Sequence, residues 1–177
     1  MQNLDAIQTP QEMDLLVAFA DLARFHRNAT NMEPRALFDF LDAYYEFVGD
    51  IVEGAGGTVV KFIGDAALIV FSDADAGLLA LLRLKEEGDA WLRGQNSTCH
   101  HYIKAHFGPV TVGPVGTRSA KRFDVFGETV NTCAMLKANG VAITPQAFRS
   151  LAPETRKRFK KHTPPVTYIP VEEPHRD

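Results

Sequence analysis

The chain has 177 residues, of which 45% are hydrophobic and 23% are charged, and its formal net charge is −3. This length suits one domain with a hydrophobic core, and the slight acidic excess argues against a nucleic-acid partner, because duplex-DNA binders normally show a basic excess. With two cysteines and no apolar run longer than six residues, we expect no disulfide framework, no membrane span and a cytoplasmic location, unless the chain was cut from a longer membrane-attached protein.

The N-terminal part predicts a strand followed by an amphipathic helix. Residues 14–22, DLLVAFADL, are mostly apolar and end next to an aspartate, which is typical of a buried strand. The polar stretch 25–34 is predicted to be a partly helical connection, and Pro34 suits a first helical turn. From Leu37 onward apolar residues recur at spacings of four, three, four and three, which places them on one helix face until a glycine cluster at 54–57 ends the helix.

The next segment predicts a hairpin and a second helix. Residues 58–71, TVVKFIGDAALIVF, read as two strands rich in β-branched residues that meet at a Gly64–Asp65 turn. Ser72 and Asp75 resemble a capping box. This pair would open a helix that runs to about Arg93.

The C-terminal half predicts more hairpins and shorter helices. Residues 101–116, HYIKAHFGPVTVGPVG, alternate polar and apolar around Gly108–Pro109, which predicts a second hairpin. The expected elements that follow are a polar loop at 117–122, a strand at 123–126, a helix from 128 to about 137, a strand at 141–144, a helix at 145–151 and a weak hairpin at 155–171. Hairpins mixed with helices predict a single α+β domain over residues 1–177, with an antiparallel-rich sheet and helices packed on it.

Three charged residues stand out because they lie in or beside apolar strands. Asp21 and Asp65 each lie at a strand end, where two carboxylates brought together would suit Mg²⁺, although aspartate is also common at strand ends and turns. Lys61 lies within an apolar strand, although lysine is depleted in strands. It is either a snorkelling surface lysine or a donor aimed at a ligand.

Two further polar residues bracket the start of the third predicted helix, in FDVFGETVNTCAMLK. Asp124 lies in the short preceding strand, where it is either an ordinary strand-end acid or a functional one, and Asn131 lies inside the helix, where its propensity is middling to poor. Asn131 is either a surface residue or a donor to a phosphate or sugar oxygen.

Four segments, taken together and in order, resemble the catalytic domain of class III nucleotidyl cyclases. They are AFADLARF, GGTVVKFIGDAALIVF, HFGPVTVGPVG and FDVFGETVN. The resemblance covers a core of about 14–150 and, less closely, a C-terminal hairpin at about 155–171. It implies a ferredoxin-like or palm-type sheet and the conversion of a nucleoside triphosphate to a 3′,5′-cyclic nucleotide.

The resemblance also implies roles for individual residues. Asp21 and Asp65 match the aspartates that bind two divalent ions, Mg²⁺ or Mn²⁺. Lys61 and Asp124 match the pair that reads adenine, so ATP is favoured over GTP. Asn131 matches the asparagine that holds the ribose and the transition state.

Two more implications concern the C-terminal hairpin and the assembly. Lys160 falls at the place of a phosphate-binding lysine, although the basic run 155–162 is equally typical of a solvated surface. The family works as a head-to-tail dimer with sites shared between subunits, in which Asp21 and Asp65 would come from one chain and Lys61, Asp124 and Asn131 from the other. Because one chain carries both halves, the resemblance implies a homodimer.

One position departs from the family pattern. Four residues after Asn131 the family carries an arginine that stabilises charge on the phosphate, and here that residue is Met135. A missing transition-state donor costs about 10²–10³ in rate. We expect that Lys137 does not substitute for it, because two further helical residues turn Lys137 about 200° around the axis. The other candidate substitutes are cations of the polar loop: Arg118, Lys121 and Arg122.

Three interpretations of function therefore remain open. The first is a slow adenylate cyclase, and its variant is a cyclase with GTP or relaxed base preference. The second is a catalytically impaired nucleotide-binding homologue that signals by binding or dimerising. The third is an α+β interaction domain in which the matched residues are incidental.

Overall fold

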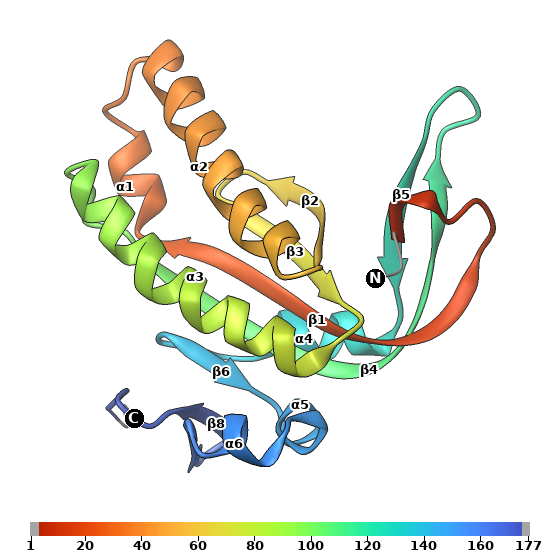
Figure 1. Cartoon of the computed structure of the whole chain (residues 1–177). Helices are drawn as coiled ribbons and strands as arrows, with labels where there is room; N and C mark the ends of the chain where they lie inside the picture. The colour runs from red at the N-terminus through yellow and green to blue at the C-terminus, as the bar shows by residue number, and fades with distance from the viewer. Residues whose placement is uncertain (1–3, 175–177) are drawn as a thin grey trace.

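The computed structural model of the chain describes residues 4–174, and these build one mixed sheet with helices on both faces (Figure 1). The strand order is β2-β3-β1-β4-β6-β8-β7, and β5 pairs with β4 outside this path. The strands are β1 (Gln11–Ala23), β2 (Thr58–Ile63), β3 (Ala66–Phe71), β4 (His100–Gly116), β5 (Lys121–Phe126), β6 (Val141–Ile143), β7 (Phe159–His162) and β8 (Thr167–Pro170). All pairs are antiparallel except β4 with β6, which confirms the predicted α+β class.

Helices pack on both faces of the sheet, so the core has two parts. The helices are η1 (Leu4–Ala6), α1 (Phe25–Ala29), α2 (Pro34–Gly54), α3 (Ala74–Gly94), α4 (Glu128–Met135), α5 (Pro145–Ser150) and α6 (Pro153–Arg156). The side chains of α2 and α3 pack with one face of the sheet in the larger apolar cluster. Those of α4 and of η1 pack with the other face in a smaller cluster. Among residues 4–174, none of the helices combines the length and apolarity that crossing a membrane requires.

The predicted hairpin at Gly108–Pro109 is wrong, because β4 continues through it as one strand paired with β1 over its first thirteen residues. Pro109 stands opposite Asp14, and its carbonyl accepts a hydrogen bond from the Thr129 hydroxyl at 2.7 Å. In a strand the N–H and C=O of one residue point to the same edge. An N–H group at position 109 would therefore point toward α4 and away from β1. For this reason the proline removes no hydrogen bond from the ladder between β1 and β4.

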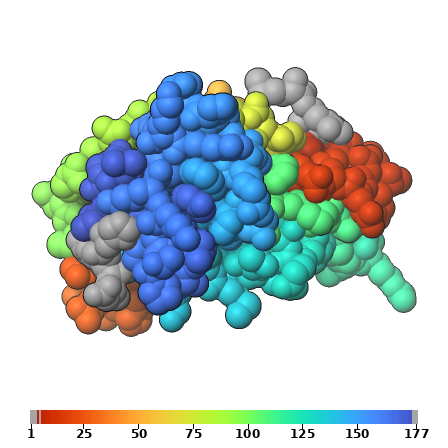
Figure 2. Space-filling view, turned by 90° about the horizontal axis from the view of Figure 1, so that it is seen from below, coloured from red at the N-terminus to blue at the C-terminus, as the bar shows by residue number. Residues whose placement is uncertain are grey.

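The hairpin that does form joins β4 to β5. The two strands pair from Thr111 opposite Phe126 to Gly116 opposite Lys121, and the loop 117–120 connects them. This β4–β5 arm projects from the body of the molecule, and its tip stands out in the space-filling view (Figure 2).

The start of α3 also differs from the prediction. The N-cap is Asp73, whose side chain accepts hydrogen bonds from the backbone N–H groups of Asp75 and Ala76. Asp75 does not return the bond as a capping box requires. Its carboxylate instead accepts hydrogen bonds from the N–H of Ala152 at 2.8 Å and the hydroxyl of Thr155 at 3.0 Å. The predicted capping acid thus ties α3 to the C-terminal segment, a partner that local sequence does not reveal.

A close approach between α3 and β4 encloses a buried polar chain. A Cβ atom on Gly88 would lie 2.5 Å from the ring of His101, so only glycine fits there. His101 is fully buried, and its Nδ1 lies 2.9 Å from Asp89 while its Nε2 lies 3.2 Å from the hydroxyl of Tyr44. In the β1–β4 register His101 stands opposite Leu22, one residue after Asp21. The polar chain therefore lies next to the end of β1 that carries Asp21.

Candidate active site

Asp21 and Asp65 lie together at one end of the sheet. The pairing of β1 with β3 ends with Ala20 opposite Ala67, so the residues that follow in β1 meet the turn that precedes β3. The carboxyl group of Asp21 lies close enough to that of Asp65 to raise its pKa, and the backbone N–H groups of Asp65 and Leu22 lie close enough to lower it. The structure thus brings together two aspartates that the sequence separates.

The surroundings of Asp65 favour a bound cation. Burial raises the pKa of its carboxyl group, and the neighbouring carboxyl group of Asp21 raises it further, to about 6, against the lowering effect of the backbone N–H groups. Within residues 4–174, no group of three or more His, Cys, Asp or Glu side chains is placed to hold a metal ion. A carboxylate pair nevertheless fits Mg²⁺ or Mn²⁺, since such ions bind through one or two carboxylates and take further oxygen ligands from phosphates and water.

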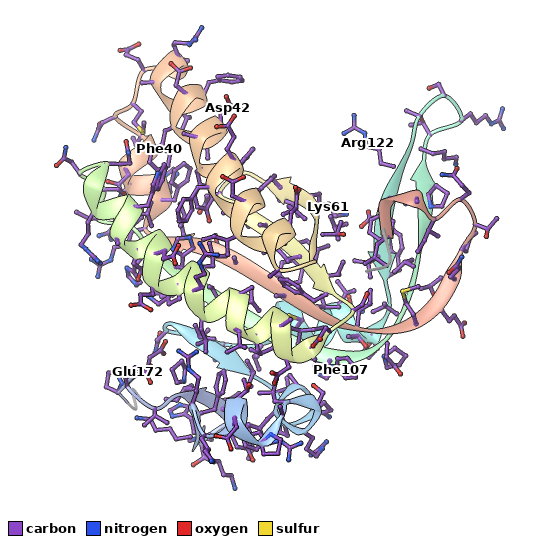
Figure 3. All side chains as sticks on the ribbon, in the orientation of Figure 1. Phe40, Asp42, Lys61, Phe107, Arg122 and Glu172 are labelled. Atoms are coloured by element: carbon purple, nitrogen blue, oxygen red, sulfur yellow. The ribbon has the colours of Figure 1, made fainter. Side chains whose placement is uncertain are left out.

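Lys61 and Asp124 form a second pair in the same chain. The ammonium Nζ of Lys61 on β2 lies 2.5 Å from Oδ2 of Asp124 on β5, although the residues are 63 positions apart. The side chains are 42% and 16% exposed, so a ligand can reach both. Figure 3 shows Lys61 on β2 at the side that faces the β4–β5 arm, where Arg122 also lies. This pair presents a donor next to an acceptor.

Asn131 and Met135 lie one turn apart on α4, and both are exposed, with Met135 at 82%. The helix ends at Met135, because Leu136 has an extended backbone with ψ of 137°. The predicted helix to Lys137 was therefore two residues too long. The expectation that Lys137 is turned about 200° away from Met135 around the helix axis does not apply. Lys137 instead lines the same pocket of about 430 Å³ as Met135 and Thr132.

Lys160 lies apart from these groups. It is on β7, at the opposite edge of the sheet from β2, and its ammonium donates a hydrogen bond to the carbonyl of Val171 at 2.8 Å. The structure therefore ties Lys160 to its own hairpin and does not bring it to Lys61 or Asp124.

Sequence reasoning missed Tyr45 on α2. The helical spacing that predicted this helix accounts for its neighbour Tyr44, which is fully buried. The hydroxyl of Tyr45 donates to the carbonyl of Gly64 at 2.6 Å, and its ring stacks on Phe62 with centroids 3.8 Å apart. An aromatic residue beside the buried helix face was the available signal, and it does not identify the partner.

The architecture is that of nucleotide cyclase catalytic domains. The crystal structure of the adenylyl cyclase CyaB from P. aeruginosa matches with a TM-score of 0.81 at 20% identity, over 94% of this chain and 97% of that one. At this identity the likeness shows the fold.

The sequence establishes the family. The model of the adenylate and guanylate cyclase catalytic domain matches residues 7–165, and the chain belongs to this family, which confirms the resemblance drawn from the four motifs.

Relatives of both kinds are similar to the chain. The receptor-type guanylate cyclase Gyc76C of Drosophila melanogaster is 30% identical over 145 residues, which are 76% of this chain and 9% of the relative. An adenylate cyclase of Anabaena cylindrica is 27% identical over 154 residues, which are 78% of this chain and 31% of the relative. The chain thus spans less than a third of the length of these curated relatives, and base preference has to be argued from the site.

Proposed function

We propose that this chain is an adenylate cyclase domain that converts ATP to 3′,5′-cyclic AMP and pyrophosphate. The observation that carries the proposal is the presence of two pairs in one chain: the neighbouring carboxyl groups of Asp21 and Asp65, and the ion pair of Lys61 with Asp124. Membership of the family supports cyclase chemistry. The two pairs support a divalent metal and adenine as the particular ligands.

Adenine is the base that suits Lys61 and Asp124. It presents a ring nitrogen that accepts a hydrogen bond and an exocyclic amine that donates one, while lysine only donates and a carboxylate only accepts. Guanine presents the reverse pattern and leaves both protein charges mismatched, which a polar site rejects by orders of magnitude. Lys61 is 42% exposed, so solvent screens its charge and the ion pair contributes little to stability. Exchanging the pair for contacts with a base therefore costs little.

The remaining residues suit the transfer step. The 3′-oxygen of ATP forms a bond to the α-phosphorus, the bond from that phosphorus to the bridging oxygen breaks, pyrophosphate leaves, and the 3′-hydroxyl proton is released. Asp21 and Asp65 would hold two Mg²⁺ or Mn²⁺ ions, which when bound neutralise the triphosphate and lower the pKa of the attacking hydroxyl. With its pKa of about 6, Asp65 is mostly ionised at pH 7. Asn131 offers an amide donor to the ribose or phosphate.

A second copy of the chain would complete each site. Large apolar side chains near the two pairs are exposed: Ile63, between Lys61 and Asp65, is 59% exposed, and Phe126, two residues after Asp124, is 51% exposed. Exposed apolar surface next to charged groups is typical of an interaction site. Because each chain carries both pairs, a homodimer with two equivalent sites needs no other protein.

The strongest alternative is a relative that binds ATP without turning it over, and Met135 is the observation that favours it. A thioether neither donates a hydrogen bond nor carries charge. In the catalytic proposal this loss slows the reaction, and Lys137, which lines the same pocket, is a candidate to supply a positive charge.

Purified protein with ATP and Mn²⁺ tests the proposal, with cyclic AMP measured by mass spectrometry. We expect product from the wild type and none above background from Asp65→Ala. Equal signal from the two proteins refutes the catalytic assignment. Calorimetric binding of ATP with metal, without product, selects the alternative, and no binding leaves only an interaction domain. A panel with GTP, CTP and UTP reads base preference in the same assay.

Mixing two inactive variants tests the shared site. Asp65→Ala keeps Lys61, and Lys61→Met keeps Asp65, so a mixed dimer would contain one intact site out of two. We expect little activity from either variant alone and recovery of up to roughly a quarter of wild-type activity on mixing, since random exchange makes half the dimers mixed. No recovery, with exchange verified by native mass spectrometry, contradicts the shared site.

A further inference from the structure

The β2–β3 hairpin carries Lys61 and Asp65, and helix α2 contacts it at two points through a single side chain. The Tyr45 hydroxyl donates to the carbonyl of Gly64 at 2.6 Å. Its ring lies nearly parallel to that of Phe62, with an interplanar angle of 8° and centroids 3.8 Å apart. The two contacts fall on the residues that directly follow Lys61 and directly precede Asp65.

An irregularity in β2 decides which face Lys61 occupies. The register with β3 shifts between Val59 and Lys61, so that Val60 and Lys61 together stand opposite Leu68. Such a bulge re-aims the side chains that follow it. Val59 and Phe62 both pack with the cluster under α2 and α3, whereas Val60 packs with the cluster on the other face. In a regular strand Val59 and Phe62 would point to opposite faces.

The position of Phe62 under α2 therefore determines where Lys61 points. With Phe62 on the helix side, Lys61 points to the opposite face, where it meets Asp124 on β5. The Tyr45 ring covers Phe62 on that helix side. Loss of the stack removes one of the contacts that favour the bulged register over a regular one.

The turn is held from two sides. Gly64 has a φ of 62°, a left-handed conformation that glycine adopts without strain. Its carbonyl accepts a hydrogen bond from Tyr45 on α2, while the carboxyl group of the next residue, Asp65, lies close enough to the backbone N–H of Leu22 on β1 for that group to lower its pKa. The Asp65 side chain is thus located by α2 as well as by the sheet.

We propose that Tyr45 is a positioning residue, whose hydroxyl sets the place of Asp65 and whose ring sets the direction of Lys61. This rests on the proposed function, since it assigns Asp65 to the metal and Lys61 to the base. The two roles are separable, because Tyr45→Phe removes the hydroxyl and keeps the ring, whereas Tyr45→Leu removes both.

Tyr168 on β8 provides a matched control. Its ring stacks on Phe148 with centroids 3.8 Å apart at 6°, almost the geometry of Tyr45 on Phe62, but it lies far along the sheet from the hairpin. Tyr168→Phe and Tyr168→Leu therefore repeat the same chemical changes without touching Lys61 or Asp65.

The test measures binding of the Mn²⁺ complexes of α,β-methylene ATP and α,β-methylene GTP by calorimetry, so it does not depend on turnover. We expect Tyr45→Phe to weaken the binding of the ATP analogue about tenfold, the lower end of the cost of losing a group that orients a metal ligand. The ratio of the affinities for the ATP and GTP analogues should stay unchanged. Tyr45→Leu should also move that ratio toward one. Hydrogen exchange of residues 58–71 in the metal-free protein should be faster in Tyr45→Leu than in the Tyr168 variants.

The outcomes distinguish failure of the proposed function from failure of the positioning role of Tyr45. Wild-type protein that binds neither analogue overturns the proposed function and the positioning role with it. Wild-type binding, with Tyr45 variants that match the Tyr168 variants in affinity and ratio, overturns the positioning role alone. Faster hairpin exchange with unchanged affinity and ratio overturns it too, because Tyr45 would then only stabilise the fold.

Discussion

Replacing Asp89 with asparagine tests whether the buried polar chain stabilises the fold through its charge. Oδ1 of Asp89 accepts hydrogen bonds from the backbone N–H of His101 at 2.8 Å and from its ring, and Lys85 contacts the other oxygen. Burial raises the pKa of this carboxyl group, but the bonds from His101 and Lys85 outweigh burial and hold the pKa at about 2 instead of 3.8. The native state therefore favours the ionised form.

The magnitude and its pH dependence follow from this lowered pKa. A native pKa almost two units below the unfolded one corresponds to about 2 kcal/mol of stability at pH 7, which is present above pH 4 and lost as pH falls through 2. Only 16% of the Asp89 side chain is exposed, so solvent screens this contribution little. Asp89→Asn has nearly the same shape without the charge, and we expect it to lower the melting temperature by roughly 4–8 °C at pH 7.

Urea unfolding followed by fluorescence of Trp91, the single tryptophan, measures the loss. We expect the difference from wild type to be about half as large at pH 3 as at pH 7, because the native carboxyl group is still ionised there while the unfolded one is mostly protonated. Asp39→Asn is the control, since Asp39 pairs with Arg35 at a site where the side chains are 53% and 85% exposed and should contribute less than about 1 kcal/mol. A loss equal to that of the control, or one that does not change with pH, refutes the reasoning.

Three further predictions concern the site and its surroundings. Met135→Arg should raise the rate of cyclic AMP formation by up to about 10²-fold, as a restored transition-state donor would; if the rate does not rise and Lys137→Met lowers it, Lys137 already supplies the charge. Because the pKa of Asp65 is about 6, protons compete with the metal for this carboxylate below that pH. The Mn²⁺ concentration for half-maximal activity should therefore rise up to about tenfold per pH unit below 6 and stay constant above it. A Mn²⁺ requirement that is constant from pH 5 to 8 contradicts this. Burial raises the pKa of the Cys133 thiol to about 12, so iodoacetamide should label Cys133 in urea and not in the native protein, as mass spectrometry can verify.

Local patterns were enough to predict the elements whose reasons are local. The spacing of apolar residues from Leu37 onward predicted α2, and Pro34 does start it. Asp21 and Asp65 were chosen because each lies at a strand end, and antiparallel pairing of β1 with β3 is what brings such ends together. For these features, the short-range sequence pattern predicts the same arrangement that the folded sheet contains.

The errors come from places where a distant partner overrides a local signal. Gly108–Pro109 is a strong turn signal, yet β1 pairs with β4 on both sides of it, and α4 supplies the hydrogen bond on the free edge. Asp75 has the spacing of a capping residue, but two groups in the C-terminal segment bind its carboxylate. The bulge at Val60 likewise follows from what packs on either face of β2, and a run of apolar residues does not indicate it.

The bulge also explains why an apolar hairpin tolerates a lysine and an aspartate four residues apart. Lys61 leaves the strand on the face of β5, and Asp65 turns back to the end of β1, so the two charges serve different partners although they share one turn. In the proposed homodimer they would also serve different active sites. Tyr45 on α2 contacts this hairpin at Phe62 and Gly64, the residues next to the two charges.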